Sequence, residues 1–94
     1  MKDVSEGVRQ VQERIRNVLG TLNRYRAQHL ENARIEWIMT QLEQISELLG
    51  TDRWLTHQEL RELDFHQVEG TPLEGNVPLE RELQAIRNLV ENKL

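Results

Sequence analysis

Apolar residues in the first third of the chain recur at alternating spacings of four and three. This is the heptad pattern, which places one apolar seam along a helix. Residues 3–49 contain no proline, and their only glycines are Gly7 and Gly20. The pattern therefore predicts a long amphipathic helix at the start of the chain. Its seam consists of Val4, Val8, Val11, Ile15, Val18, Leu22 and Tyr25.

A second seam occupies the rest of this stretch, but its phase differs from that of the first, and the change falls within residues 27–33. In one interpretation the helix breaks near Asn32 and folds back as a hairpin, although neither Gly nor Pro marks a turn there. In the other, a continuous helix of about 70 Å projects beyond its own domain and needs a second chain. Both interpretations stay open, and in both Gly50 is placed to cap the C-terminus. The second seam consists of Ile35, Ile38, Leu42, Ile45 and Leu49.

The second half of the chain begins with a clear helix start signal. Thr56 and Glu59 have the spacing of a capping box, and Leu55 and Leu60 have the spacing of a hydrophobic staple. They predict a short helix over about 57–66. The Gly- and Pro-bearing residues that follow predict a surface loop over 67–77. Pro78 suits the first turn of a last helix over about 78–93, whose apolar positions are Leu79, Leu83, Ile86 and Val90.

Together these elements predict an all-α fold in a single domain, residues 1–94. It is a small helical bundle with a long N-terminal helix or helical hairpin followed by two short helices. Only 37% of the residues are hydrophobic, which predicts a thin core. We therefore expect the first seam to be covered by a second copy, in a homodimer or a higher oligomer. The alternative is that the seam forms the core of the chain's own bundle. The expected interface residues are Val8, Val11, Ile15, Val18, Leu22 and Tyr25, with Trp37 and Trp54 as further anchors.

Charge suggests an alternative function. The chain has a net charge of −4, but the arginines concentrate in the first stretch, and the guanidinium group suits phosphate. A nucleic-acid-binding regulator would use Arg9, Arg16 and Arg24. Three features disfavour this alternative: the acidic net charge, the spread of the arginines around the helix, and the scarcity of aromatic residues that stack on bases.

Candidate chemistry is sparse. The chain has no cysteine and three histidines, and the histidines have no neighbours in sequence that complete a zinc site. No nucleophile motif or phosphate loop is present. We therefore expect no enzymatic activity, no metal and no cofactor. No apolar run approaches the roughly 18 residues of a membrane span, so the expected location is the cytoplasm.

These observations favour a small non-enzymatic protein that acts through helix-surface contacts. An adaptor, a chaperone-like protein or an inhibitor would fit this description. The expected partners are a second copy of the chain and, in addition, another protein. Membranes, small-molecule substrates and, in the main interpretation, nucleic acids are not expected partners.

Overall fold

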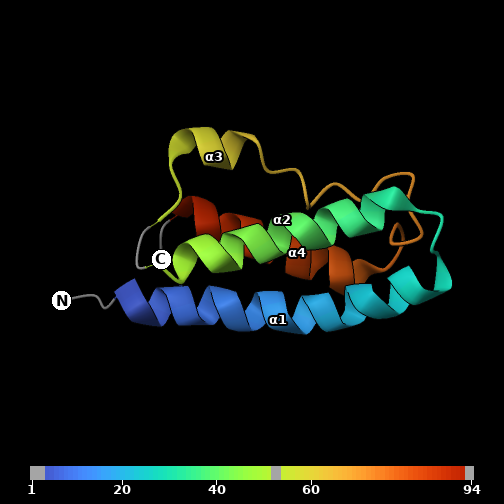
Figure 1. The fold of residues 1–94 in the computed structure, drawn as a ribbon, viewed down its shortest axis with the longest axis horizontal. Helices are drawn as coiled ribbons and strands as arrows, with labels where there is room; N and C mark the ends of the chain where they lie inside the picture. Colours follow the sequence, from blue (N-terminus) through green and yellow to red (C-terminus); the bar gives the residue numbers. More distant parts are fainter. Residues whose placement is uncertain (1–3, 52–53, 93–94) are drawn as a thin grey trace.

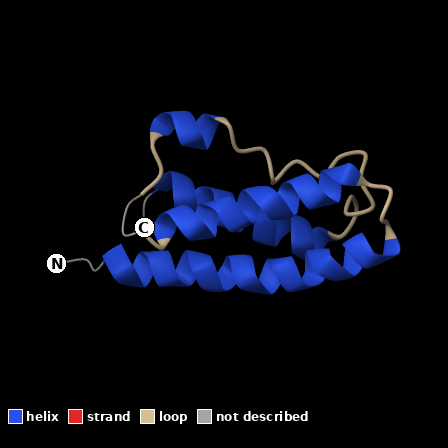
Figure 2. Ribbon diagram, in the orientation of Figure 1, coloured by secondary structure: helices blue, strands red, loops and turns tan. Residues whose placement is uncertain are grey.

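The computed structural model describes residues 4–51 and 54–92, and its helices lie side by side along one long axis (Figure 1). Helix α1 spans Val4–Gln28 and α2 spans Ala33–Leu49, while the short α3 spans His57–Arg61 and α4 spans Val77–Asn92. No strand occurs in these residues (Figure 2). The all-α prediction is therefore confirmed. The predicted bounds at residues 3 and 93 lie outside the described residues.

Residues 4–49 form a hairpin and not one continuous helix. Helix α1 ends at Gln28, and α2 runs back beside it in the opposite direction (Figure 1). Asn32 supplies the turn signal that Gly or Pro would otherwise give. Its side-chain oxygen accepts hydrogen bonds from the backbone N–H groups of Arg34 and Ile35, which caps the N-terminus of α2. At the other end, Gly50 caps α2 as predicted, although its φ of −66° is right-handed.

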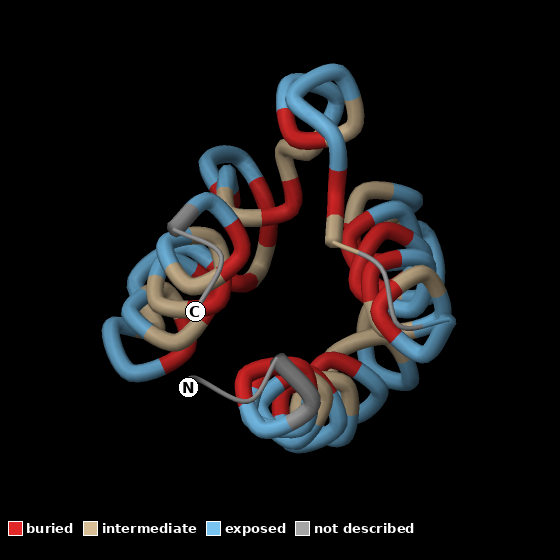
Figure 3. Tube along the Cα trace, turned by 90° about the vertical axis from the view of Figure 1, so that its left-hand side faces the viewer, coloured by how far each residue is buried: buried red, intermediate tan, exposed pale blue. Residues whose placement is uncertain are grey.

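Helix α1 is the common support of the bundle. Both α2 and α4 pack on it, whereas these two helices have little contact with each other. Viewed along the axis, α1, α2 and α4 form three sides around a centre, and the buried stretches of each helix lie on its side nearest that centre (Figure 3). The fourth side is closed by residues 54–76, which we call the connecting segment.

The connecting segment supplies core side chains although most of it is irregular. Phe65 and Leu73 are fully buried, and Val68 is nearly so. The prediction of a surface loop over 67–77 is therefore wrong at Val68 and Leu73, because the open side between α2 and α4 needs apolar side chains to fill it. Turns in this segment use Gly70 and Gly75, which have positive φ angles of 78° and 92°.

Helix α3 begins at the residue predicted from the sequence, but it ends earlier than predicted. The Thr56 hydroxyl accepts a hydrogen bond from the N–H of Glu59, and the Glu59 carboxylate accepts one from the N–H of Thr56, which completes the capping box. The helix ends at Arg61 instead of residue 66. Beyond it, the N–H of Asp64 donates to Gln41 on α2, so a tertiary hydrogen bond replaces one that would continue the helix.

The last helix matches its predicted pattern. It begins at Val77, and its four predicted apolar positions are all buried. Its first turn is held by Asn76, whose side-chain oxygen accepts from the N–H of Leu79 and whose amide nitrogen donates to the Tyr25 hydroxyl 2.8 Å away. This pair of bonds joins the start of α4 to the end of α1.

We predict that Phe65→Ala is the most damaging single truncation in the connecting segment. Removing a fully buried phenyl ring leaves a cavity and typically costs about 3–5 kcal/mol. Urea unfolding monitored by circular dichroism measures this loss. Val77→Ala, at a residue 49% exposed, is the control and should change stability by less than about 0.5 kcal/mol. Equal effects of the two substitutions would show that Phe65 does not fill the core.

Candidate functional site

The structure places most of the predicted interface inside the chain. Val8, Val11, Ile15, Val18 and Leu22 are buried by the chain's own later segments. The expectation that a single chain cannot cover this seam is therefore wrong, because the connecting segment adds apolar side chains that the sequence assigned to the surface. Self-association itself stays a prediction. The side chain of Val4 lies outside the described part of the chain.

The three aromatic residues of the predicted interface have different environments. Tyr25 is half-buried, and its hydroxyl is occupied by Asn76. Trp54 is also half-buried, and its Nε1 donates to the carbonyl of Val90 at 2.9 Å, so it covers the end of α4. Trp37 is 46% exposed. It is therefore the predicted anchor that a partner can reach most easily.

Arg9, Arg16 and Arg24 are all exposed, and the helical period places them on the face of α1 opposite the core. Within the described residues none of the three has an ion pair, whereas Arg14, Arg26 and Arg34 pair with Glu82, Glu36 and Asp64. The exposed Glu13 shares this outer face. The face is therefore a mixed one, and nucleic-acid binding by these arginines stays a prediction.

A line of polar side chains on α2 fixes the connecting segment in place. Trp37 Nε1 donates to Asp64 Oδ1 at 2.9 Å, and Arg34 donates to Asp64 Oδ2 at 3.2 Å. Gln41, which is buried, donates to the carbonyl of Glu62 and accepts from the N–H of Asp64. Because these residues recur at spacings of three and four, all three point from one side of α2.

A second arginine holds the same segment from the opposite side. Arg87 on α4 donates to the carbonyls of Leu60 and Leu63 at 2.9 and 3.1 Å, while its Nε donates to Glu91. The carbonyl groups at the C-terminus of a helix carry partial negative charge and need donors. Arg87 therefore caps α3 from a distance and anchors it to α4.

The charge state of Asp64 follows from these contacts. Partial burial raises the pKa of the Asp64 carboxyl, but hydrogen bonds from Trp37 and Arg34, the charge of Arg34 and the Gln41 contact lower it. The lowering effects prevail, so the pKa lies below the ordinary value of 3.8. Asp64 is therefore ionised at neutral pH and accepts from both neighbours on α2.

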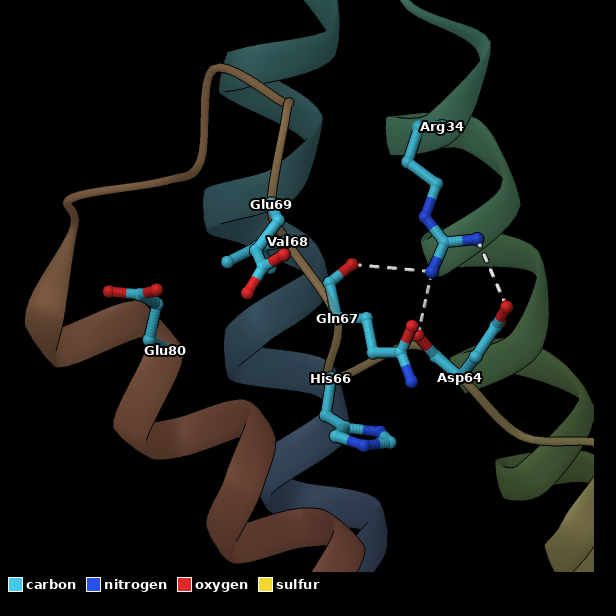
Figure 4. Close-up of a pocket in the computed structure, with 7 residues that line it drawn as sticks. All are labelled: Arg34, Asp64, His66, Gln67, Val68, Glu69 and Glu80. Carbon is cyan, nitrogen blue, oxygen red and sulfur yellow. Dashed lines mark hydrogen bonds and ion pairs between the residues drawn. The ribbon is translucent and has the colours of Figure 1, made fainter.

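A polar pocket of about 600 Å³ lies on one side of Asp64. Arg34 and Asp64 line one wall, Glu80 lies across from them, and His66 lies at one end (Figure 4). Arg34 also donates to the carbonyls of Asp64 and Gln67. Its guanidinium group therefore holds the connecting segment as well as forming an ion pair with Asp64.

His66 is a titratable group of this pocket whose buried ring nitrogen lacks a hydrogen bond within the described part of the chain. Its Nδ1 is buried and has no hydrogen-bond partner among the described residues. Desolvation and the charge of Arg87 lower the pKa of His66 below 6.5, although Asp64 and Glu91 oppose the shift. The ring is thus mainly neutral at pH 7. Within the described residues no group of three His, Asp or Glu side chains is placed to hold a metal ion.

An apolar groove of about 390 Å³ lies on the other side of Asp64, between α2 and the connecting segment. The partly exposed ring of Trp37 and the half-buried Leu48 belong to its α2 side. Leu55 and Leu63 line it from the connecting segment, and its charged lining residues are Glu59 and Glu62. This hollow presents apolar side chains from both of its sides, and we call it the Trp37 groove.

Sequence reasoning identified Trp37 but missed Asp64, Gln41 and Arg34. The one available signal was Gln41, a polar residue directly beside the apolar seam position Leu42. A polar residue that close to a seam needs a hydrogen-bond partner if it is buried. Its partner comes from residues 62–64, and no local pattern in the sequence shows which distant segment a buried amide will meet.

We predict that Asp64→Asn lowers stability at pH 7 by about 1 kcal/mol, since the hydrogen bonds from Arg34 and Trp37 lose their charged acceptor in a partly exposed site. Because the folded pKa is lowered, the charge stabilises the fold above pH 3.8, and this contribution disappears as the pH falls through the folded pKa. The difference between the two proteins should therefore shrink below that pH. Thermal unfolding of both proteins from pH 7 to pH 2.5 measures it, and a constant difference would contradict the assignment.

None of the described helices combines the length and apolar character that crossing a membrane requires. Comparisons with protein-family models, with curated proteins and with solved structures find no match for this chain.

Proposed function

We propose that the protein is a non-enzymatic interaction module that binds another protein at the Trp37 groove. The observation that carries this proposal is the exposure of Trp37, 46% of whose surface is open, beside two seams that are buried from Val8 to Leu22 and from Ile35 to Leu49. Tryptophan is enriched among the residues that dominate binding energy at protein interfaces. The apolar lining on both sides of the groove supplies the rest of a small hydrophobic patch.

The ring of Trp37 is also held in place before any partner arrives. Its Nε1 bond to Asp64 fixes the indole, and Asp64 is itself held by Arg34 and Gln41. A fixed aromatic residue that is half open to solvent is a good anchor, because its polar atom is satisfied and its apolar face is available. The cytoplasmic location expected from the sequence stays a prediction.

We predict that filling the groove abolishes partner binding and leaves the fold intact. Gln44 is exposed and lines the groove, so Gln44→Trp places an indole across it. Thr40→Trp adds the same bulk one turn earlier on α2, at an exposed residue outside the groove lining. The measurement is selection of binders from a random peptide display library on the wild-type protein, followed by retesting on both variants. Circular dichroism checks the fold of each.

The expected result is a set of peptides that bind the wild-type protein and Thr40→Trp but not Gln44→Trp. Peptides that bind all three proteins equally would place the interaction elsewhere. A library that yields no binder would also contradict the proposal, since a module of this kind must recognise some apolar sequence.

We do not expect two copies of the isolated chain to pair through the seam or through the groove. Its seam is covered internally, and pairing two copies through the groove would bring Glu59 and Glu62 of each copy close to the same residues of the other, where like charges repel. Sedimentation velocity at several concentrations measures this. A dimer would bear out the prediction made from the sequence and would place the contact on a surface other than the buried seam.

A further inference from the structure

We propose that the occupant of the Trp37 groove is a cationic amphipathic helix from another protein. This inference rests on the proposed function and adds the chemistry of the partner. It depends on three properties of the groove, which are its length along α2, the apolar character of its walls, and the sign of the charges in its lining.

The length of the groove suits a helix of a few turns. Its α2 side runs from Trp37 to Leu48, and eleven residues of helix cover about 16 Å. The opposite side is formed by α3 and its flanking residues, Leu55 and Leu63. An apolar ridge of a third helix, whose anchors recur at spacings of three and four, fits between the apolar residues of the two sides. No strand is present among the described residues, so they offer no sheet edge for an extended peptide.

The charges in the lining select a cationic partner. Glu59 and Glu62 are part of the lining, which contains no Lys or Arg. Glu59 already serves the capping box, whereas Glu62 is exposed. A partner with Lys or Arg beside its apolar ridge would place a positive charge close to the Glu62 carboxylate. Charge complementarity of this kind raises association rates and rejects acidic partners.

A second copy of this chain fits the groove less well. Its outer α1 face carries the required cations, Arg9, Arg16 and Arg24, but the exposed positions between them include Glu13, Gly20 and Asn23. That face has no large apolar side chain to place against Trp37. Its other amphipathic surfaces are already buried in its own core. The occupant must therefore carry Lys or Arg and large apolar side chains together on one helix.

The test uses three synthetic peptides of about 14 residues, long enough to span the groove as a helix. The first has Leu at helical spacing and Lys and Arg on its polar face. The second replaces every cation with Glu, and the third keeps the cationic composition but scrambles the order of the residues. Binding is followed by the fluorescence of Trp37 in a Trp54→Phe background, and calorimetry on the wild-type protein confirms the affinities.

The first peptide should bind, and the other two should bind at least about tenfold more weakly. Glu62→Lys should weaken the first peptide by about tenfold or more, and Glu62→Gln by a smaller factor. Glu47→Lys makes the same charge change at an exposed α2 residue outside the groove lining, and it should have only a small, salt-screened effect. The groove-filling Gln44→Trp should remove the binding.

Several results would overturn the inference. Equal binding of the scrambled peptide would show non-specific charge attraction, and equal binding of the acidic peptide would show that the lining charges do not select. Equal effects of Glu62→Lys and Glu47→Lys would likewise show that the lining charges do not select the partner. If the display library yields groove-dependent peptides that lack cations, the proposed function stands and this inference falls. If no binder depends on the groove, both fall. A groove-dependent dimer of the protein itself would make a second copy the occupant and would also overturn it.

Discussion

The bundle depends on how the gap between α2 and α4 is closed. Both helices pack on α1 and make little contact with each other, so the core would open to water along one side if nothing covered it. The connecting segment closes this side with Phe65, Val68 and Leu73. A chain with few apolar residues thus obtains a continuous core by using an irregular segment as its fourth wall. The same wall forms one side of the Trp37 groove, so fold and candidate site share one element.

Irregular backbone inside a small protein has to find hydrogen-bond partners outside regular secondary structure. Here the partners come from long polar side chains on the flanking helices. Gln41 and Arg34 hold residues 62–67 from α2, and Arg87 holds Leu60 and Leu63 from α4. The arginines that the sequence shows only as charged residues are thus in part structural, because backbone carbonyls are among their acceptors.

Patterns that depend on near neighbours in the sequence predicted most of the helical architecture. The capping box at Thr56, the end of α2 at Gly50 and the seam of α4 were all visible, because each is set by residues a few positions apart. The hairpin was left open because its signal, the Asn32 cap, is weaker than a glycine or a proline. The role of Phe65 and the contacts of Asp64 were not predictable in this way, since they depend on which distant residues meet. For the candidate site, the residue type singled out Trp37, but its surroundings combine α2 with the connecting segment, which lies further along the chain.

The bond between Trp37 Nε1 and Asp64 has a consequence for recognition in general. A tryptophan that is free to sample its rotamers loses that freedom when it is pressed into an interface, and the lost entropy weakens the complex. Here the indole is restrained in the unbound protein by a carboxylate that Arg34 in turn keeps in position. Much of the ordering has therefore already taken place during folding. A ligand that meets this ring encounters a preorganised surface. The free energy gained by burying the ring is then reduced by a smaller loss of side-chain entropy.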